Sequence, residues 1–318
     1  MHYIYFGTSE FAATILEKLL DVNMAPVAVV TQPDRPAGRG KKIQESPVKK
    51  IAQNGEIPLL QPERLDADAI EKIAAYNADL FIVAAYGAIL PKALLALPNK
   101  QTVNVHPSLL PLYRGPSPIQ STILNGEIKT GVTLILLDEE IDHGPILAQE
   151  MASIGYRDTS ETLSHKLALQ SALMLQKVLP EWLQGTISPT PQDHAKATFT
   201  KMITKEDGRI DWKKPAEEIE RHVRAMFPWP SSYTFWKENK NEVRLHLRRV
   251  SVLKEGPRLG SDNNTLPGEV LDTPDDELAV VCGKEILVIH ELQPEGKHIM
   301  PGSAFINGHR SIIGSILQ

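Results

Sequence analysis

The chain contains very little cysteine and no long apolar stretch. Cys282 is the single cysteine among 318 residues, so no internal disulfide can form, which fits a reducing compartment. No run approaches the roughly 20 consecutive apolar residues that a membrane-spanning helix needs. Residues 1–6 lack the basic start and the apolar length of a signal peptide. We therefore expect a cytoplasmic protein that makes no membrane contact, with Cys282 buried in a strand.

Two kinds of cofactor signature are also missing. The first expected strand, residues 2–6, leads into Gly7-Thr8-Ser9 rather than into G-x-G-x-x-G, which argues against a nicotinamide dinucleotide. The acids and histidines that could bind a metal follow no standard zinc spacing. The residues considered as metal ligands are His106, Glu139, Glu140, Asp142 and His143. We expect neither a nicotinamide cofactor nor a metal.

The first half of the chain alternates short apolar strands with amphipathic helices. Strands are expected at residues 2–6, 26–30, 80–84, 102–105 and 131–137, and helices after Ser9, after Ser46-Pro47, and at residues 67–76 and 159–179. Such alternation is typical of parallel strands joined by helical crossovers. The sequence therefore predicts an α/β fold over residues 1–188, with a Rossmann-like, doubly wound, mostly parallel sheet.

The second half follows a different pattern. Residues 189–204 are rich in Pro, Ser and Thr, and we expect them to form a linker. A helix at residues 216–225 follows, and then short β-branched runs at 233–236, 243–252, 268–271, 278–282 and 286–292. Several short strands separated by turn residues are typical of a small barrel. We predict that residues 205–318 form a second, smaller domain, an OB-like β-barrel.

Residues 102–115 combine a strand with reactive side chains and a stiff loop. The strand ends on Asn104 and His106, and Pro107, Pro111 and Gly115 then prevent regular structure. In an open α/β sheet, ligands bind at the carboxyl ends of the strands. An amide donor beside an imidazole suits an acyl-type reaction that develops an oxyanion. Taken alone, an N-x-H pattern is more often the cap of a loop.

Two motifs resemble those of folate-dependent formyltransferases, enzymes that transfer a formyl group from 10-formyltetrahydrofolate to an amine. The first motif is Asn104-x-His106 with Ser108-Leu109-Leu110-Pro111 and Tyr113-Arg114-Gly115, and the second is Asp142-His143-Gly144-Pro145-Ile146. The resemblance implies that Asn104, His106 and Asp142 are catalytic and that 10-formyltetrahydrofolate is the co-substrate. His143 departs from the residue that is usual in the family, and it is a rival acid.

The folate is expected beside these three residues. The segment after the strand at 80–84 resembles the pterin-facing segment of the family, and the loop at 108–111 would line the same cleft. The residues implied in folate binding are Ser108, Leu109, Leu110, Pro111, Tyr86, Gly87, Ile89, Leu90, Asp138 and Ile141. Periodicity alone fits Ile89 and Leu90 equally well as ordinary core residues.

Basic residues are concentrated in two parts of the chain. Residues 34–50 carry six Lys and Arg against two acids, and residues 201–258 carry fourteen against nine, although the net charge is −5. Residues 31–42 resemble the insertion of the tRNA-specific formyltransferases, and residues 205–212 and 224–230 resemble motifs that open their C-terminal barrel. The resemblance implies that initiator methionyl-tRNA is the acceptor and that Arg39, Lys41 and Lys42 contact it.

Other interpretations of the same segments stay open. A short basic run is often only a solvated loop. Sugar-nucleotide formyltransferases share the motifs of the second half, so an amino-sugar nucleotide is the alternative acceptor. An RNA-binding module on an inactive formyltransferase fold would also carry the basic segments, but Asn104, His106 and Asp142 are all present. A glycinamide-ribonucleotide enzyme would not need residues 200–318. We expect a monomer.

Overall fold

The computed structural model of the protein describes residues 1–37, 42–238, 241–253, 265–273 and 276–318. The chain forms two compact units. The first comprises Met1–Pro118, Lys129–Ser153 and Thr162–Lys201, and the second comprises Ile119–Ile128, Ile154–Glu161 and Met202–Gln318. Two short segments from the first half of the chain thus belong to the second unit. The domain boundaries at residues 188 and 204 stay a prediction.

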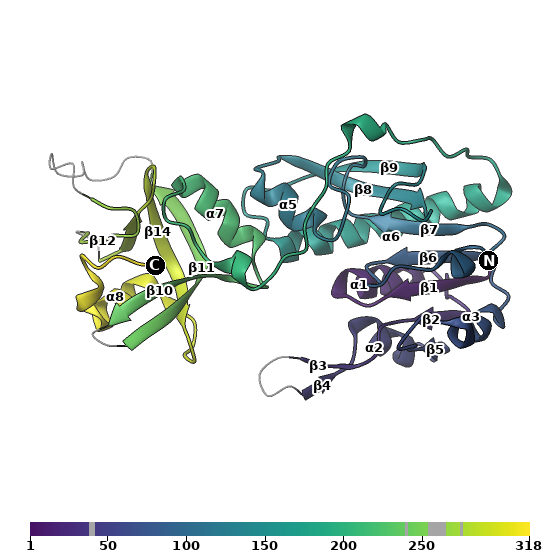
Figure 1. The fold of residues 1–318 in the computed structure, drawn as a ribbon, viewed down its shortest axis with the longest axis horizontal. Helices are drawn as coiled ribbons and strands as arrows, with labels where there is room; N and C mark the ends of the chain where they lie inside the picture. The colour runs from purple at the N-terminus through teal and green to yellow at the C-terminus, as the bar shows by residue number, and fades with distance from the viewer. Residues whose placement is uncertain (38–41, 239–240, 254–264, 274–275) are drawn as a thin grey trace. The chain divides into compact units, whose positions relative to one another are not determined.

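The first unit is built on a seven-stranded sheet in the order β5-β2-β1-β6-β7-β8-β9 (Figure 1). The strands are β1 (Tyr3–Gly7), β2 (Ala28–Val30), β5 (Leu59–Leu60), β6 (Leu80–Ala84), β7 (Thr102–His106), β8 (Lys129–Leu136) and β9 (Ile146–Ser153). Pairing is parallel from β5 to β7, whereas β8 runs antiparallel to both β7 and β9. The predicted mostly parallel α/β sheet is confirmed, and β9 is a strand that the sequence did not indicate.

The helices of the first unit are α1 (Glu10–Leu20), α2 (Pro47–Asn54), α3 (Ala67–Ala74), the short α4 (Lys92–Leu95) and most of α6 (Ser160–Gln184), of which the sequence did not indicate α4. Two of them begin directly after the predicted serine caps. Ser9 accepts a hydrogen bond from the Ala12 amide at the start of α1, and Ser46 accepts one from the Lys49 amide at the start of α2. The helix α6 continues past Pro180, five residues beyond its predicted end at 179. Its last turn is tied down because Trp182 donates to the Lys100 carbonyl.

The basic segment that follows β2 forms part of a hairpin. Strand β3 (Arg35–Ala37) pairs antiparallel with β4 (Lys42–Gln44). At its base, Asp34 accepts from Lys49 Nζ at 2.6 Å and from Gln61 Nε2 at 2.8 Å, which ties the hairpin to α2 and β5. Arg39 and Lys41 lie outside the described residues.

The second unit is an antiparallel half-barrel. Its main strands follow the order β10-β11-β14-β13-β12, and β15 pairs with β14. The strands are β10 (Ser232–Glu238), β11 (Asn241–Leu253), β12 (Val270–Leu271), β13 (Leu278–Val281), β14 (Ile286–Pro294) and β15 (Met300–Pro301). The helices are α7 (Ala216–Ala225), α8 (Gly302–Gly308) and most of α5 (Pro118–Leu124). The last residues bridge its open side: Gln318 exchanges backbone hydrogen bonds with Phe235, and Leu317 donates to the Gly268 carbonyl.

The larger of the two hydrophobic clusters described in the second unit forms its main core. Trp212, Trp236, Leu247 and Phe305 are among its buried members, and α7 packs its apolar face on β11 and β14. Cys282 lies at the edge of this core and is 5% exposed. Burial raises the pKa of the Cys282 thiol to about 12, so the group is protonated near neutral pH and inert as a nucleophile. Cys282 is buried as expected, but it directly follows β13 rather than lying in the strand.

Candidate active site

Asn104 and His106 lie on one face of β7 because they are two residues apart on a strand. The loop between β8 and β9 brings Asp142 against both. Asp142 Oδ1 lies 3.4 Å from Asn104 Nδ2 and 3.4 Å from His106 Nδ1. The other oxygen, Oδ2, accepts from the Gly115 amide at 2.8 Å. The structure therefore brings together the three side chains that the motifs single out.

The ring of His106 is held at both nitrogens. Nε2 lies 2.9 Å from the Tyr113 carbonyl oxygen, and Nδ1 faces the Asp142 carboxylate. The Tyr113 carbonyl can only accept, so Nε2 carries the hydrogen of that bond, whereas the contact of Nδ1 with Asp142 becomes an ion pair only when the ring is protonated. Because the side chain is 5% exposed, such an imidazolium would place a buried positive charge next to the Asn104 amide.

The loop after β7 is fixed by polar contacts with β8. Thr133 donates to the Ser108 carbonyl, and its oxygen accepts from the Leu110 amide at 3.2 Å. Ser108 and Leu110 are buried, whereas Leu109 and Pro111 are half-buried. Gly115 has φ +106° and closely approaches Thr200, whose carbonyl oxygen would lie 2.9 Å from an added Cβ. The four residues proposed to line the folate cleft therefore sit on a rigid segment.

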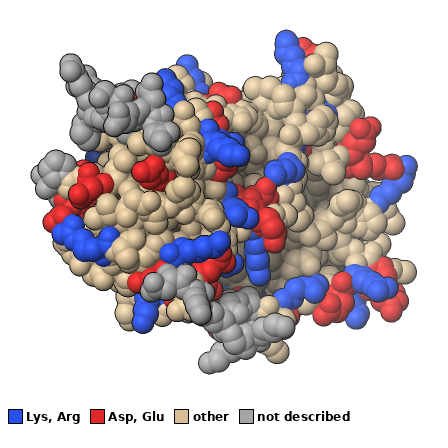
Figure 2. All heavy atoms as spheres, turned by 60° about the vertical axis from the view of Figure 1, so that its left-hand side comes forward, with Lys and Arg blue, Asp and Glu red and all other residues tan. Residues whose placement is uncertain are grey.

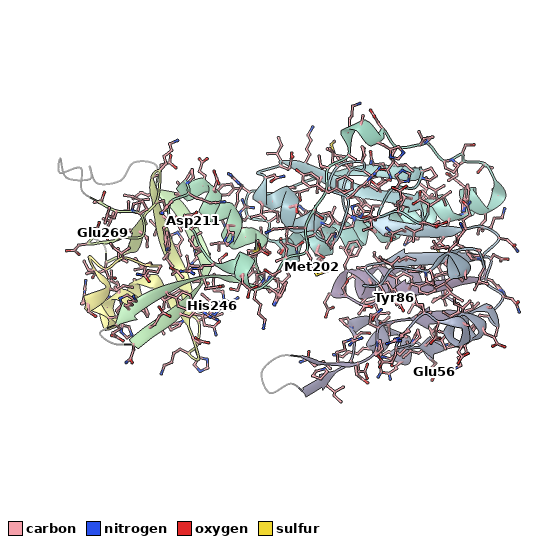
Figure 3. All side chains as sticks on the ribbon, in the orientation of Figure 1. Glu56, Tyr86, Met202, Asp211, His246 and Glu269 are labelled. Carbon is pink, nitrogen blue, oxygen red and sulfur yellow. The ribbon has the colours of Figure 1, made fainter. Side chains whose placement is uncertain are left out.

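The segment after β6 divides into buried and exposed residues. Tyr86, labelled in Figure 3, is 2% exposed and packs edge-on against Phe6 at 5.5 Å. Its burial raises the pKa of the phenol to about 12. Leu90 is also buried in the core of the sheet, whereas Ile89 is 80% exposed. Gly87, directly after Tyr86, has φ +89°. Of these side chains, Ile89 is the one available to cover a ligand.

His143 and His106 contact different residues. Its Nδ1 lies 2.7 Å from Asp138 Oδ2, and its ring stacks on His194 with centroids 4.1 Å apart. Ile141, between Asp138 and Asp142, is 59% exposed. Within the described residues, no three His, Cys, Asp or Glu side chains are grouped so that they could hold a metal ion.

Family models cover both halves of the chain. Residues 1–179 match the formyl transferase model, and residues 202–310 match the model of the formyl transferase C-terminal domain. A methionyl-tRNA formyltransferase of Chloroflexus aurantiacus is 42% identical over 97% of this chain and 97% of its own length. The corresponding protein of Myxococcus xanthus is 41% identical over 98% of this chain and 96% of its own length. The chain belongs to the methionyl-tRNA formyltransferase family.

Solved structures show that the fold extends beyond this family of enzymes. An N-formyltransferase from Helicobacter canadensis superposes with a TM-score of 0.63 at 19% identity, covering 91% of this chain and 98% of the other. HypX from Aquifex aeolicus superposes with a TM-score of 0.62 at 18% identity, covering 98% of this chain and 48% of the other. At these identities the likeness shows the fold alone.

Two residues near Asp142 were given no role by sequence reasoning. Gln192, inside the predicted linker, donates to the Asp142 carbonyl at 2.9 Å, and buried Arg114 donates to Gln192. The chain around Gln192 runs along the site, since Thr198 accepts from the Arg114 amide and Thr200 donates to the Arg114 carbonyl. Tyr113-Arg114-Gly115 was a signal for Arg114, but a glutamine directly after Pro191 carries no signal of its own.

Basic side chains on the second unit stack on aromatic rings. The guanidinium of Arg244 lies 4.8 Å from the ring centre of Tyr233, and that of Arg248 lies 5.7 Å from that of Phe227. Arg244 and His246 (Figure 3) are two residues apart on β11 and share a face, whereas the register of the strand shifts around Arg248. Figure 2 shows basic and acidic side chains intermixed on the face it presents.

Within the described residues, no helix is long and apolar enough to cross a membrane.

Proposed function

We propose that this protein transfers the formyl group of 10-formyltetrahydrofolate to the α-amino group of methionyl initiator tRNA and thereby supports the initiation of translation. The observation that carries the proposal is the approach of Asn104 and His106 to one oxygen of Asp142, at 3.4 Å each. Curated relatives named as methionyl-tRNA formyltransferases match nearly the whole chain, both units included. This is the activity of the family to which the chain belongs.

Asn104 is the proposed neutral donor to the reacting carbonyl. When the amine attacks the formyl carbon, negative charge develops on the formyl oxygen, and a donor must already point there. Asn104 Nδ2 uses one hydrogen toward Asp142 Oδ1, so its second hydrogen remains for the oxyanion. The amide needs no change of protonation to do this.

His106 is the proposed source of positive charge. Held between Tyr113 and Asp142, the imidazolium stabilises a neighbouring oxyanion through its field. For direct donation to the formyl oxygen, one of these two ring contacts must be exchanged for the substrate. Asp142 stabilises the charged ring and keeps its orientation.

Asp142 is also the proposed route for the proton. A new bond forms between the amine nitrogen and the formyl carbon, and the bond from that carbon to N10 of the folate breaks. The proton lost by the amine passes to Asp142, directly or through water, and reaches the departing N10. These steps use no covalent intermediate on the protein, and they require neither a metal nor a nicotinamide cofactor.

The folate is proposed to lie along two segments beside Asn104, one after β6 and one after β8. Backbone groups near Gly87 and Asp138 would bond the polar edge of the pterin, and exposed Ile89 and Ile141 would cover its face. The remaining proposed contacts come from Tyr86, Leu90 and the loop Ser108, Leu109, Leu110 and Pro111. Tyr86 and Leu90 contribute through their main chain, because their side chains belong to the core.

The tRNA is proposed to contact the β3–β4 hairpin through Arg39, Lys41 and Lys42. Lys42 is the first residue of β4, and the side chains of all three lie outside the described part of the structure. An ion pair between Asp34 and Lys49 anchors the base of the hairpin. The protein is further proposed to act as a monomer in the cytoplasm.

A parallel assay tests the acceptor. The purified protein is given 10-formyltetrahydrofolate labelled in the formyl group, with methionyl initiator tRNA in one reaction and dTDP-linked amino sugars in another. Label should enter the methionyl-tRNA, and the Asp142→Asn variant should transfer far less. Transfer to the amino sugar without transfer to tRNA would refute the proposal and support the alternative acceptor.

A further inference from the structure

Gln192 connects the loop that carries Asp142 to a buried arginine. We propose that Gln192 is a positioning residue for formyl transfer, which holds the main chain around Asp142 and so sets the place of its carboxylate. The inference rests on the proposed function, in which Asp142 acts during the reaction. Gln192 comes from the segment after α6, about fifty residues from Asp142 in sequence, and it is 6% exposed.

Asp142 needs to be held from outside its own loop. Its φ is +49°, in the left-handed region that residues other than glycine seldom adopt, although aspartate tolerates it better than most. The four residues before it, 138–141, are all exposed, so little packing supports this side of the loop. Contacts from other segments therefore determine where Asp142 lies.

Gln192 supplies two of these contacts. Its Nε2 donates to the Asp142 carbonyl at 2.9 Å and to the Gly144 carbonyl at 2.7 Å, so both hydrogens of the amide are used. Gly144 in turn packs closely on β8, where an added Cβ would lie 1.8 Å from the Leu136 carbonyl oxygen. Gln192 therefore ties the backbone of Asp142 to the end of the loop that is already fixed.

Arg114 sets the orientation of the Gln192 amide. Oε1 of Gln192 accepts from Arg114 Nε at 3.2 Å and from Nη2 at 2.7 Å. A guanidinium can only donate, so the amide oxygen must face Arg114 and the amide nitrogen must face the two carbonyls. Arg114 is 4% exposed, and its Nη2 also lies 2.8 Å from His194 Nδ1, which limits its movement.

The neighbours of Arg114 contact the other two members of the site. The Tyr113 carbonyl bonds His106 Nε2, and the Gly115 amide donates to Asp142 Oδ2. One tripeptide therefore holds the histidine, the carboxylate and, through Gln192, the backbone behind the carboxylate. Losing the Gln192 contacts should let Asp142 shift relative to His106, and misplacement by about 1 Å can cost on the order of 100-fold in rate.

Two substitutions separate the contacts of Gln192. Gln192→Met keeps the length of the side chain and removes both donors together with the acceptor of Arg114. Gln192→Glu keeps an acceptor for Arg114, which protects the fold, but offers no hydrogen to the carbonyls of Asp142 and Gly144. Each should lower kcat about 10- to 100-fold, with KM for folate and for methionyl-tRNA little changed. Thermal unfolding of Gln192→Glu should stay close to that of the wild type.

Gln170→Met is the matched control. Gln170 lies on α6, and its Nε2 contacts Glu150 and the Met151 carbonyl at the surface. The substitution removes a comparable pair of donors without touching the loop of Asp142. Its kcat should equal that of the wild type.

A double-mutant cycle tests whether Gln192 acts through Asp142. In an Asp142→Asn background, Gln192→Met should lower kcat by less than about twofold, because the positioned group has already lost its function. Equal fold-losses in both backgrounds, or wild-type kcat in both Gln192 variants, would overturn the inference. Failure of the proposed function has a different signature: the wild type then formylates no methionyl-tRNA, or Asp142→Asn keeps full turnover.

Discussion

His106 and Asp142 approach each other through one pair of atoms, Nδ1 and Oδ1, at 3.4 Å. The same Oδ1 lies 3.4 Å from the Asn104 amide, and the second carboxylate oxygen is occupied by the Gly115 amide. A single oxygen of Asp142 thus connects the two proposed donors of the site. Substitution of Asp142 is therefore expected to disturb both donors, whereas substitution of either donor leaves the other in contact with the carboxylate.

Replacing Asn104 or His106 by alanine should abolish most of the turnover. Each change removes a proposed stabiliser of the oxyanion, and loss of one such donor lowers kcat by about 10²–10³-fold. Formylation rates at saturating folate and tRNA measure the effect, and circular dichroism checks that the fold is intact. Asn77→Ala, on the exposed turn after α3, is the control. Near-wild-type turnover of Asn104→Ala would contradict the assignment.

Asp142→Asn should be as damaging as His106→Ala, and the double variant should be little worse than either. Groups that act as one unit show such non-additive losses. Single-turnover rates of the two single variants and the double variant form the test. Fully multiplicative losses would show that the two residues work independently. His143→Ala should cost much less, since His143 bonds Asp138 instead; a severe loss there would mean that the acid has been assigned to the wrong histidine.

Replacing Arg39, Lys41 and Lys42 by alanine should weaken the use of methionyl-tRNA and flatten its dependence on salt. Each phosphate contact contributes roughly −0.9 to the slope of log affinity against log salt, because bound counterions are released. The measurement is kcat/KM for tRNA across a salt series, with KM for folate as the internal reference. The control variant carries alanine at Lys18, Lys72 and Lys177, on α1, α3 and α6, and so loses the same number of positive charges away from the hairpin. Equal slopes for the hairpin variant and the wild type would exclude the hairpin from tRNA binding.

The stability of the protein should fall on mild acidification through His222. Burial lowers the pKa of His222 below the ordinary value of 6.5, and the neutral ring bonds the Asp207 carbonyl and Ser232 in the second unit. Because the fold prefers the neutral ring, the stabilisation is complete above pH 6.5 and is lost as the pH falls and the unfolded chain takes up the proton. The loss is limited to about 1.4 kcal/mol per pH unit for one group.

Urea unfolding of the wild type and of His222→Gln at a series of pH values measures this contribution. The variant should be less stable near neutral pH, and its free energy of unfolding should fall less on acidification. His2→Gln, at an exposed position, should follow the wild-type curve. Parallel curves for the wild type and His222→Gln would show that another group causes the acid sensitivity.

Local patterns in the sequence determined most of the elements and the family. Strand β6 and helix α7 begin and end at the residues that apolar runs and periodicity predict, and α1 and α2 start after their predicted serine caps. The motifs at 104–115 and 142–146 singled out Asn104, His106 and Asp142. These predictions succeed because each signal is contained in a few consecutive residues, where capping, side-chain periodicity and turn chemistry act directly.

Only the tertiary structure decided how distant segments meet. The antiparallel direction of β8, the pairing of β9 and the transfer of residues 119–128 and 154–161 to the second unit depend on contacts far along the chain. The same holds for Gln192, whose bonds to Asp142 and Gly144 join residues 50 and 48 positions apart. A glutamine has no local preference that reveals such partners, because its place is set by the packing of a buried arginine and two backbone carbonyls rather than by its neighbours in sequence.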